Sequence, residues 1–283
     1  MRLVLKWDRF ELDLSRRTHV MGVLNVTPDS FSDGGRFFET EKAVAQALQM
    51  ERDGADIIDL GGESTRPFSK EISVEAEIER VIPVLQGVKG KLKAPVSIDT
   101  RKAAVAEAAL EAGAAMINDI SALQHDPKMA PLAARWGVPI IVMHMKGTPE
   151  IMQQSPHYED LIPEIIQFLQ QAVKRATSAG VEERLIMVDP GIGFGKGFDD
   201  NLQIIKQLHR LEVLEKPILV GSSNKGFIGE ILQKGVSERN TGTMATVSAA
   251  VMNGAHVVRV HDVAKAVETV KIIDAIKRGT ITP

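Results

Sequence analysis

The sequence predicts an α/β fold, a (β/α)8 TIM barrel with a short N-terminal β-hairpin. Eight apolar runs of strand length alternate with longer helical patterns along the chain. Eight such units in roughly 250 residues match the size of a closed barrel of this type. Several apolar runs also end on a polar residue, and parallel strands bring such ends together at one edge of the sheet. We therefore expect a polar site at the carboxyl ends of the strands.

The elements follow from these patterns in order along the chain. Residues 1–17 alternate apolar and charged side chains, so we expect them to form the hairpin, as a plug or lid over the bottom of the barrel. The expected strands are 20–26, 56–61, 95–99, 115–120, 139–145, 185–189, 217–221 and 257–260. The expected helices are 39–53, 74–91, 101–112, 128–136, 161–179, 200–214, 225–233 with 243–252, and 263–277. Helix stop signals are supplied by Gly54, Gly113, Gly137, Gly180 and Gly254.

We expect a single domain over residues 1–283, because no linker rich in Pro, Gly or Ser and no shift in composition interrupts the pattern. A doubly wound open sheet is the alternative fold. Such a fold binds dinucleotides through a G-x-G-x-x-G turn after its first strand, which this chain lacks. The polar strand ends are also spread over most units, whereas an open sheet gathers them at one switch point.

Composition narrows the functional class. The chain has 283 residues, 44% of them hydrophobic, so it can bury a large core. A net charge of -3 argues against a partner such as nucleic acid or an anionic membrane, which would need a basic face. The absence of cysteine excludes disulfides, thiolate metal sites and a cysteine nucleophile, and it fits a cytoplasmic location. No apolar stretch approaches the ~20 residues of a membrane helix. We expect a soluble protein.

The polar strand ends carry the candidate chemistry, and they are Asn25, Asp59, Asp99, Asn118 and Asp189. Asp99 and Asp189 could act as an acid and base pair, as metal ligands, or as acceptors for a ligand with adjacent N–H donors. No group of His and acids at metal-binding spacing appears in the sequence, which disfavours a tightly held transition metal. The amide oxygen of Asn25, together with diphosphate oxygens and water, would suit Mg²⁺.

Cationic residues near the same strand ends predict an anionic ligand. Arg66 lies beside Pro67 in a long loop after the second barrel strand, where its guanidinium could hold a phosphate or carboxylate. Lys225, Arg259 and His261 follow or close the last two strands, a frequent phosphate site in barrels. For Arg259, inside an apolar strand, a ligand is favoured over a buried carboxylate partner. His261 could equally be an ordinary loop histidine with satisfied hydrogen bonds.

Eight segments together resemble the dihydropteroate synthases of the pterin-binding enzyme family. They occur in the family's order and spacing from Met21 to the final helix, and they read MGVLNVTPDSFSDGG, GGESTRP, SIDT, INDI, MHM, DPGIGFGK, NKGFIG and VRVHD. A lone SIDT or DPGIG would be weak evidence, because the wider family shares such pieces. The full combination is specific.

The resemblance implies a transferase of folate biosynthesis and a sulfonamide target. Its reaction joins 6-hydroxymethyl-7,8-dihydropterin diphosphate to 4-aminobenzoate and yields 7,8-dihydropteroate and diphosphate. The implied mechanism is dissociative loss of Mg-diphosphate followed by attack of the arylamine. The family also implies Mg²⁺ as cofactor, small-molecule substrates as partners, and a homodimer.

The resemblance assigns roles to site residues as well. Asp99, Asn118 and Asp189 would bind the aminopyrimidine edge of the pterin, with Met145 packed beneath it, whereas Asp59 receives no substrate. Asn25 would contact the metal. The implied catalytic residues are Arg66, Lys225, Arg259 and His261. Thr65 joins the diphosphate contacts, and the implied 4-aminobenzoate pocket is lined by Phe194, Ser223, Thr65 and Pro67.

One position departs from the family pattern, and two other functions share the pterin pocket. The family usually reads S-R-K where this chain has Ser223, Asn224 and Lys225, so one cation and its five donors are missing. The loss of this arginine affects the expected catalytic efficiency more than the assignment to the family. The alternatives are a methyltetrahydrofolate:corrinoid methyltransferase, against which the SFSDGG and STRP loops argue, and a non-catalytic pterin-binding paralogue.

Overall fold

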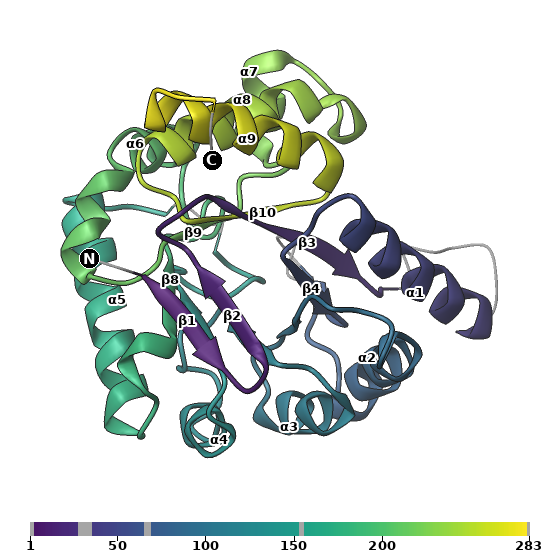
Figure 1. Ribbon diagram of the computed structural model, residues 1–283. Coiled ribbons are helices and arrows are strands. Elements are labelled where there is room, and N and C mark those ends of the chain that lie inside the picture. The colour runs from purple at the N-terminus through teal and green to yellow at the C-terminus, as the bar shows by residue number, and fades with distance from the viewer. Residues whose placement is uncertain (1–2, 28–35, 65–68, 153–155, 282–283) are drawn as a thin grey trace.

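Eight parallel strands form a barrel surrounded by helices in the computed structural model, which describes residues 3–27, 36–64, 69–152 and 156–281 (Figure 1). The barrel strands are β3 (His19–Asn25), β4 (Ile57–Gly61), β5 (Val96–Asp99), β6 (Met116–Asp119), β7 (Ile140–Met143), β8 (Ile186–Asp189), β9 (Leu219–Val220) and β10 (Val257–Val260). The α-helices are α1 (Arg36–Arg52), α2 (Val74–Val88), α3 (Ala103–Ala112), α4 (Met129–Trp136), α5 (Leu161–Ser178), α6 (Phe198–Lys206), α7 (Gly226–Leu232), α8 (Asn240–Met252) and α9 (Val263–Arg278). Short 3₁₀ helices are η2 (Glu183–Leu185), η3 (Leu208–Leu214) and η4 (Val236–Glu238).

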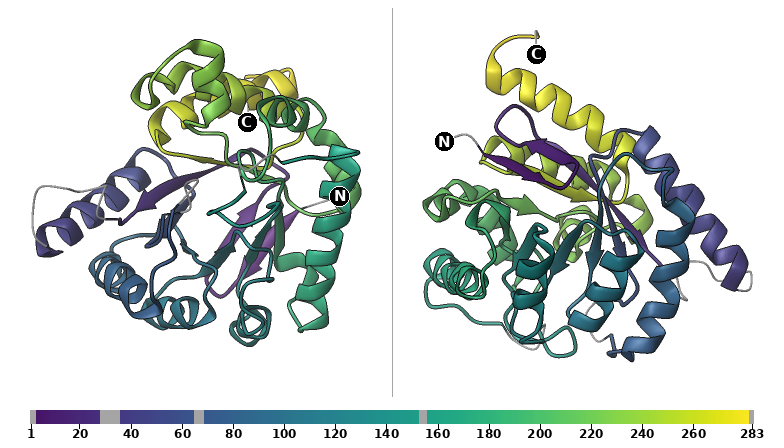
Figure 2. Two further views of the ribbon diagram at one scale, coloured as in Figure 1. Left: turned by 180° about the vertical axis from the view of Figure 1, so that it is seen from behind. Right: turned by 60° about the horizontal axis from the view of Figure 1, so that its bottom comes forward.

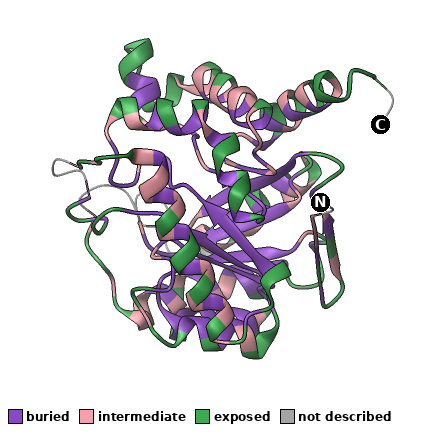
Figure 3. Cartoon of the chain, turned by 90° about the vertical axis from the view of Figure 1, so that its left-hand side faces the viewer, coloured by how far each residue is buried: buried purple, intermediate pink, exposed green. Residues whose placement is uncertain are grey.

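The strand order shows that the sheet closes on itself. The strands run β8-β7-β6-β5-β4-β3-β10-β9, with every neighbouring pair parallel. A parallel bridge between Val188 of β8 and Ile218, just before β9, joins the two ends of this series. The predicted TIM barrel is therefore confirmed, and the open-sheet alternative is wrong. The strands are buried on both faces, as parallel strands wrapped by helices must be (Figure 3).

The hairpin lies across the amino-terminal end of the barrel, as predicted (Figures 1 and 2). Strand β1 (Val4–Trp7) pairs antiparallel with β2 (Phe10–Asp13). The buried Trp7 donates its Nε1 hydrogen to the carbonyl oxygen of Ala115, 2.8 Å away and directly before β6. Burial of a large aromatic ring with its polar atom satisfied fixes the hairpin as a plug.

Several predicted boundaries need correction. The strand expected over 139–145 ends at Met143. Met145 lies beyond this end, and it is buried in a small second core with Ile120, Met143, Met152 and Phe194. The helix expected over 200–214 splits into α6 and η3, and the one expected over 74–91 ends at Val88. Both predictions followed apolar periodicity, which a 3₁₀ turn or a following loop can continue.

Glycine ends the helices where it was expected to. Gly137 follows α4 with a φ of 61°, and its N–H donates to carbonyls in the last turn of the helix. This left-handed conformation suits glycine, which has no Cβ to clash with the backbone. Within the described residues, no helix combines the length and apolar character that crossing a bilayer requires.

Candidate active site

Three polar residues, Asn25, Asp99 and Asn118, lie in one row across neighbouring strands at the carboxyl end of the barrel. Asn25 of β3 is in register with Gly61 of β4, Gly61 with Asp99 of β5, and Asp99 with Asn118 of β6. Asp189 ends β8 in register with Met143. The predicted convergence of strand ends is therefore present in the fold.

Arg259 ties this row together from the eighth barrel strand, β10. Its Nε donates to Asp59 Oδ2 at 2.6 Å, and its Nη2 donates to Asp99 Oδ2 at 2.7 Å. Asn118 Nδ2 also donates to Asp59 Oδ2, at 3.1 Å. The sequence favoured a ligand over a buried carboxylate as the partner of Arg259, and the structure shows that two buried carboxylates, those of Asp59 and Asp99, contact it. A guanidinium inside an apolar strand needs charge compensation, and two buried carboxylates supply it.

The same arrangement shifts the protonation equilibria of the site. Burial raises the pKa of Asp99 to about 7; the charge of Arg259 opposes that shift and the charge of Asp59 adds to it. Burial alone would lower the pKa of Arg259, but the two carboxylates outweigh it and the net shift is upward. Oδ1 of Asp59 and Oδ1 of Asp99 are buried without a hydrogen-bond partner among the described residues. Such acceptors suit a ligand that carries N–H donors.

Asp189 is held by the loop that follows it. Its Oδ1 accepts a hydrogen bond of 2.6 Å from the backbone N–H of Gly191. Burial raises the pKa of Asp189 to about 6, while the Gly191 N–H and the charges of Lys225 and Arg259 oppose the shift. Asp189 thus remains a preorganised acceptor opposite Asp99.

Lys225 and Phe194 form a second part of the site. Lys225 precedes α7 at its N-cap, and its Nζ lies 4.0 Å from the centroid of the Phe194 ring. Gly193 makes this approach possible, because a Cβ there would come within 2.8 Å of Lys225 Cδ. Burial and the charge of Arg259 lower the pKa of Lys225 to about 8, against the opposing charges of Asp189 and Asp99.

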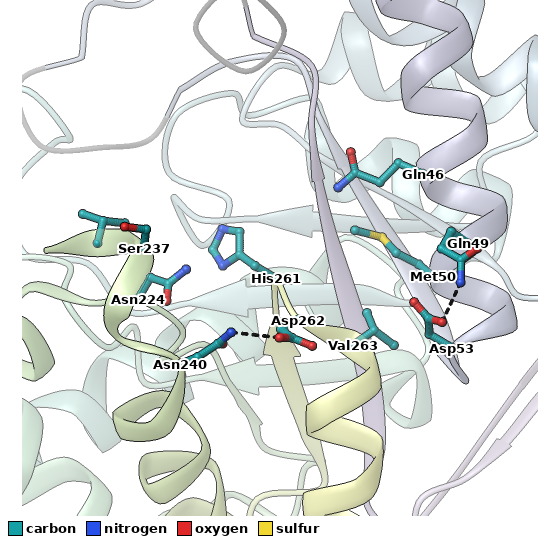
Figure 4. Close-up of a pocket in the computed structure, with 11 residues that line it drawn as sticks. Gln46, Gln49, Met50, Asp53, Asn224, Ser237, Asn240, His261, Asp262 and Val263 are labelled. Atoms are coloured by element: carbon teal, nitrogen blue, oxygen red, sulfur yellow. Dashed lines mark hydrogen bonds between the residues drawn. The ribbon is translucent and has the colours of Figure 1, made fainter.

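Ser223 and His261 join the ends of the last two strands. Ser223 Oγ lies 2.8 Å from His261 Nδ1, and the backbone N–H of His261 donates to the same hydroxyl at 3.4 Å. His261 also borders a cavity of about 390 Å³ that lies between α1 and the start of α8 and α9 (Figure 4). In that view Asn224 and Ser237 lie beside the imidazole, and Gln46 lies across the cavity from it.

Asn25 can supply one oxygen ligand to a divalent cation. A Cβ on Gly61 would lie 3.4 Å from Asn25 Oδ1 and 3.6 Å from Asp99 Cβ, so the amide oxygen is close to the carboxylate row. The described residues contain no group of three His, Cys, Asp or Glu side chains arranged for a metal ion. A hard cation that takes one amide oxygen and completes its shell with phosphate oxygens and water is compatible with this donor set.

Three predicted residues, Thr65, Arg66 and Pro67, lie outside the described residues. The structure does describe the base of their loop. Glu63 Oε1 accepts from the backbone N–H of Ile72 at 3.0 Å, and Glu63 Oε2 accepts from Lys102 Nζ at 3.2 Å. Nothing in the sequence distinguished Glu63 and Lys102, because charged side chains are normally solvated and these two are buried.

Two further buried polar residues near the site were also missed, His144 and Lys196. Lys196 ends the DPGIGFGK segment and is only 1% exposed, and His144 is 4% exposed. The glycine-rich context of Lys196 indicated close backbone packing, but nothing in the sequence indicated that the lysine itself would be enclosed. Asp59, by contrast, was predicted at a strand end as a structural or orienting acid without a substrate, and it pairs with Arg259.

Comparisons with known proteins agree with this geometry. The family model described as "Pterin binding enzyme" matches residues 21–261. The dihydropteroate synthase of Synechocystis is 47% identical over 94% of this chain and 92% of its own, and that of Escherichia coli is 43% identical over 93% of each. A crystal structure of the Yersinia pestis synthase with a sulfonamide drug complex superposes with a TM-score of 0.92 at 42% identity, over 97% of this chain and 99% of the other.

A second solved structure extends the agreement. The Xanthomonas albilineans synthase with 4-aminobenzoic acid superposes with a TM-score of 0.91 at 41% identity, covering 98% of this chain and 99% of that one. The resemblance inferred from the motifs therefore holds over the full barrel. The chain belongs to the pterin-binding enzyme family and, within it, to the dihydropteroate synthases.

Proposed function

We propose that this synthase joins 6-hydroxymethyl-7,8-dihydropterin diphosphate to 4-aminobenzoate, with release of diphosphate. Relatives of the same fold support this choice of substrates: the Xanthomonas albilineans enzyme has been solved with 4-aminobenzoic acid and in complex with 7,8-dihydropteroate. The observation that carries the proposal is the set of buried residues Asp99, Asn118 and Asp189 at the strand ends, in which Asp99 binds Arg259 through one oxygen and has its other oxygen without a partner among the described residues.

The three acceptors would recognise the aminopyrimidine edge of the pterin, whose adjacent N–H donors match carboxylate oxygens. Asp99 and Asp189 act here as recognition groups, and neither needs to abstract a proton during bond formation. Arg259 can keep its contact with Asp59 while the pterin takes up Asp99, so its guanidinium would lie over the ring face. Met145, buried beside Phe194, would pack beneath the ring.

Bond cleavage would place growing negative charge on the diphosphate. The carbon–oxygen bond of the pterin methylene breaks, the arylamine nitrogen forms the new carbon–nitrogen bond, and this nitrogen then loses a proton. Thr65, Arg66, Arg259 and His261 would hold the departing diphosphate, and Lys225 would bridge the two substrate pockets. Because an arylamine is uncharged near neutral pH, it attacks without a dedicated general base.

Asn25 would hold Mg²⁺ through its amide oxygen, next to the carboxylate row. The ion, when bound with the substrate, supplies Lewis-acid stabilisation of the diphosphate charge. Phe194, Ser223, Thr65 and Pro67 would line the 4-aminobenzoate pocket. The contact between Lys225 and the Phe194 ring supports a position for one wall of this pocket beside the proposed pterin site.

The decisive test is to incubate the purified protein with the pterin diphosphate, labelled 4-aminobenzoate and Mg²⁺, and to measure dihydropteroate and released diphosphate. We expect equal amounts of the two products and competition between a sulfonamide and 4-aminobenzoate. Absence of product from folded protein would contradict the proposal and favour a non-catalytic pterin-binding role. Methyl transfer from methyltetrahydrofolate to a corrinoid would instead favour the methyltransferase.

We further propose a homodimer and a cytoplasmic location. Apolar side chains on neighbouring ends of α8 and α9 support the dimer: Met252, Ile272 and Ile276 are each more than half exposed. A hydrogen bond from Lys277 Nζ to the carbonyl of Val251 brings these helix ends together. The location is supported by the absence of cysteine, and cell fractionation would test it.

A further inference from the structure

Lys196 is enclosed at the junction of two loops above the barrel, although the reaction proposed above makes no use of it. It is 1% exposed, and its Nζ has three acceptors: His144 Nδ1 at 2.9 Å, the carbonyl of Phe194 at 2.9 Å and the carbonyl of His144 at 3.3 Å. A buried ammonium has three hydrogens to donate, and here each has a partner. Such full satisfaction ties together the groups that accept from it.

We infer that Lys196 is a positioning residue for the arylamine substrate, holding the Phe194 wall of the 4-aminobenzoate pocket against the end of β7 through His144. The inference rests on the placement of 4-aminobenzoate beside Phe194 that is proposed above. Neither Lys196 nor His144 touches a reacting atom in this arrangement. Both act through the backbone of Phe194.

The charge state of the pair is consistent with this contact. Burial and the neighbouring charges of Lys196 and Lys146 lower the pKa of His144 to about 2, so the imidazole is neutral and its Nδ1 accepts from Lys196. Burial lowers the pKa of Lys196 to about 7, and the charge of Asp189 opposes that shift. The ring of His144 is fixed in turn by an edge contact with Phe168, with centroids 4.7 Å apart.

Close packing fixes the position of the loop between β8 and α6. A Cβ on Gly191 would overlap the carbonyl oxygen of His144, and a Cβ on Gly195 would overlap that of Lys146. Tyr158 donates its hydroxyl hydrogen to the carbonyl of Gly195 at 2.6 Å. The loop therefore lies directly on residues 144–146, and Lys196 joins the two segments through its hydrogen bonds to His144.

The position of Phe194 follows from this packing. Its carbonyl accepts a hydrogen bond from Lys196, its side chain belongs to the second core with Met143, Met145 and Met152, and its ring lies 4.0 Å from Lys225 Nζ. If the carbonyl is released, the ring loses its fixed place between the methionines and Lys225. The pterin acceptors Asp99 and Asn118 should be affected far less, because they lie on β5 and β6 and hydrogen-bond to Arg259 and to Asp59, respectively.

A pair of His144 variants tests the inference. In His144→Asn the side-chain oxygen can take the place of Nδ1, whereas His144→Leu removes the acceptor and keeps an apolar group beside Phe168. We expect His144→Leu and Lys196→Met each to raise the KM for 4-aminobenzoate about tenfold, with kcat and the Kd for the pterin changed less than about twofold. His144→Asn should stay near the wild type. Each single variant already breaks the contact between Lys196 and His144, so the double variant Lys196→Met with His144→Leu should raise the KM little further.

Controls separate positioning from loss of stability and from a misplaced substrate. Lys216→Met removes another buried lysine, paired with Glu183 at the opposite end of the barrel, and should leave the KM unchanged. If Lys196→Met and His144→Leu lower only the melting temperature and leave the KM of the folded protein unchanged, the inference is wrong. Phe194→Ala shows which proposal has failed: an unchanged KM there contradicts the placement of 4-aminobenzoate, whereas a raised KM there with no effect of His144→Leu contradicts the positioning role alone.

Discussion

Asp99 has two functions at the residue scale, because it both compensates Arg259 and offers an acceptor to a ligand. Arg259 donates to Asp99 of β5 and to Asp59 of β4, so carboxylates on two strands compensate its charge. In the proposed complex, a ligand with N–H donors takes over Asp99 while Asp59 keeps the guanidinium in place. This role accounts for a fully buried acid, Asp59, beside the strand ends.

Asp99→Asn should weaken pterin binding strongly while the barrel stays folded. The change removes a charged acceptor, and hydrogen bonds to charged groups contribute about 1.5–3 kcal/mol, so we expect a loss of about tenfold to a hundredfold in affinity, measured by calorimetry. Asp274→Asn is the matched control: Asp274 is also buried, and it accepts from the N–H and hydroxyl of Thr18 at the far end of the barrel. It should lower stability alone. Equal affinity of Asp99→Asn and the wild type would contradict the recognition role.

Pterin affinity should also fall as the pH is lowered through about 7. The pKa of Asp99 is raised to about 7 in the free site, so this carboxyl takes up a proton in that range. Donors on the pterin favour the charged form, and binding must therefore release the proton at a cost that approaches tenfold per pH unit. Titrations at several pH values in buffers of different ionisation enthalpy would reveal the release. A flat profile in the wild type between pH 6 and 8 would argue against an ionised Asp99 in the complex.

The backbone conformation at position 224 explains why an asparagine occurs there. Its φ is 59°, in the left-handed region that asparagine tolerates better than most residues. Its N–H donates to Thr243 Oγ1 at 3.1 Å, and Arg239 Nη1 donates to its carbonyl at 3.0 Å. These two backbone contacts hold the turn before Lys225, and the side chain adds a longer contact of 3.5 Å between Thr243 Oγ1 and Asn224 Oδ1.

Asn224→Arg should leave the reaction intact and lower stability by about 1 kcal/mol, the cost of a left-handed residue with a long side chain. Asn224→Gly is its control, because it relieves the strain without adding a cation. Steady-state rates and thermal melts of both variants would measure the two effects. Abolished turnover in folded Asn224→Arg would mean that the geometry of this turn depends on the asparagine.

At the scale of elements, the loop between β8 and α6 shows how glycines position a site. Gly191, Gly193 and Gly195 all have positive φ, and each faces another segment where no Cβ fits. The loop can therefore lie on residues 144–146 and beside Lys225 at once. The longer loop after β4 uses side chains for the same purpose, with Glu63 bonded to Lys102 and to the backbone of Ile72.

Gly195→Ala and Gly137→Ala form a matched pair that separates backbone strain from packing. Their φ values are 62° and 61°, but a Cβ on Gly137 meets nothing within 4 Å, whereas one on Gly195 overlaps the carbonyl of Lys146. We expect Gly137→Ala to cost about 1 kcal/mol of unfolding free energy and no activity. Gly195→Ala should cost more and should raise the KM for 4-aminobenzoate. Similar melting temperatures and rates for the two variants would contradict the close packing of this loop.

The whole molecule is organised as a closed barrel with one end plugged and the other end functional. The hairpin covers the amino ends of the strands through Trp7, and the polar residues occupy the carboxyl ends (Figure 1). Parallel strands make this division possible, because all of them end at the same face. On the outer surface, the ends of α8 and α9 carry the exposed apolar side chains that support the proposed dimer.

Ile272→Glu combined with Ile276→Glu should convert the proposed dimer to a monomer. The two side chains are 63% and 59% exposed and are four residues apart on α9, so they share one face of the helix. Burying two carboxylates in an apolar interface is unfavourable, and light scattering should report a halved mass. Lys265→Glu, near the other end of α9, is the control for added charge. A monomeric wild type would contradict the dimer itself.

Much of this protein followed from sequence alone. Alternation of apolar runs with helical periods specified the barrel, because buried parallel strands and amphipathic helices leave different periods in the chain. Polar residues at the ends of those runs, including Asp99, Asn118 and Asp189, identified the functional face, because parallel strands all end at the same face of the barrel. Element boundaries were less certain, since apolar periodicity continues into the 3₁₀ helix η3 and into the second core around Met145.

Only the tertiary structure decided which polar groups meet. Arg259 and Asp59 are 200 residues apart in the chain, and Lys196 and His144 are 52 apart, so no local pattern could pair them. The sequence determined that polar groups would gather at one end of the barrel, because backbone periodicity is a local property. Their partners, and with them the buried charges and shifted pKa values of Asp99 and Lys196, depend on strand register and on loops packed across the barrel mouth.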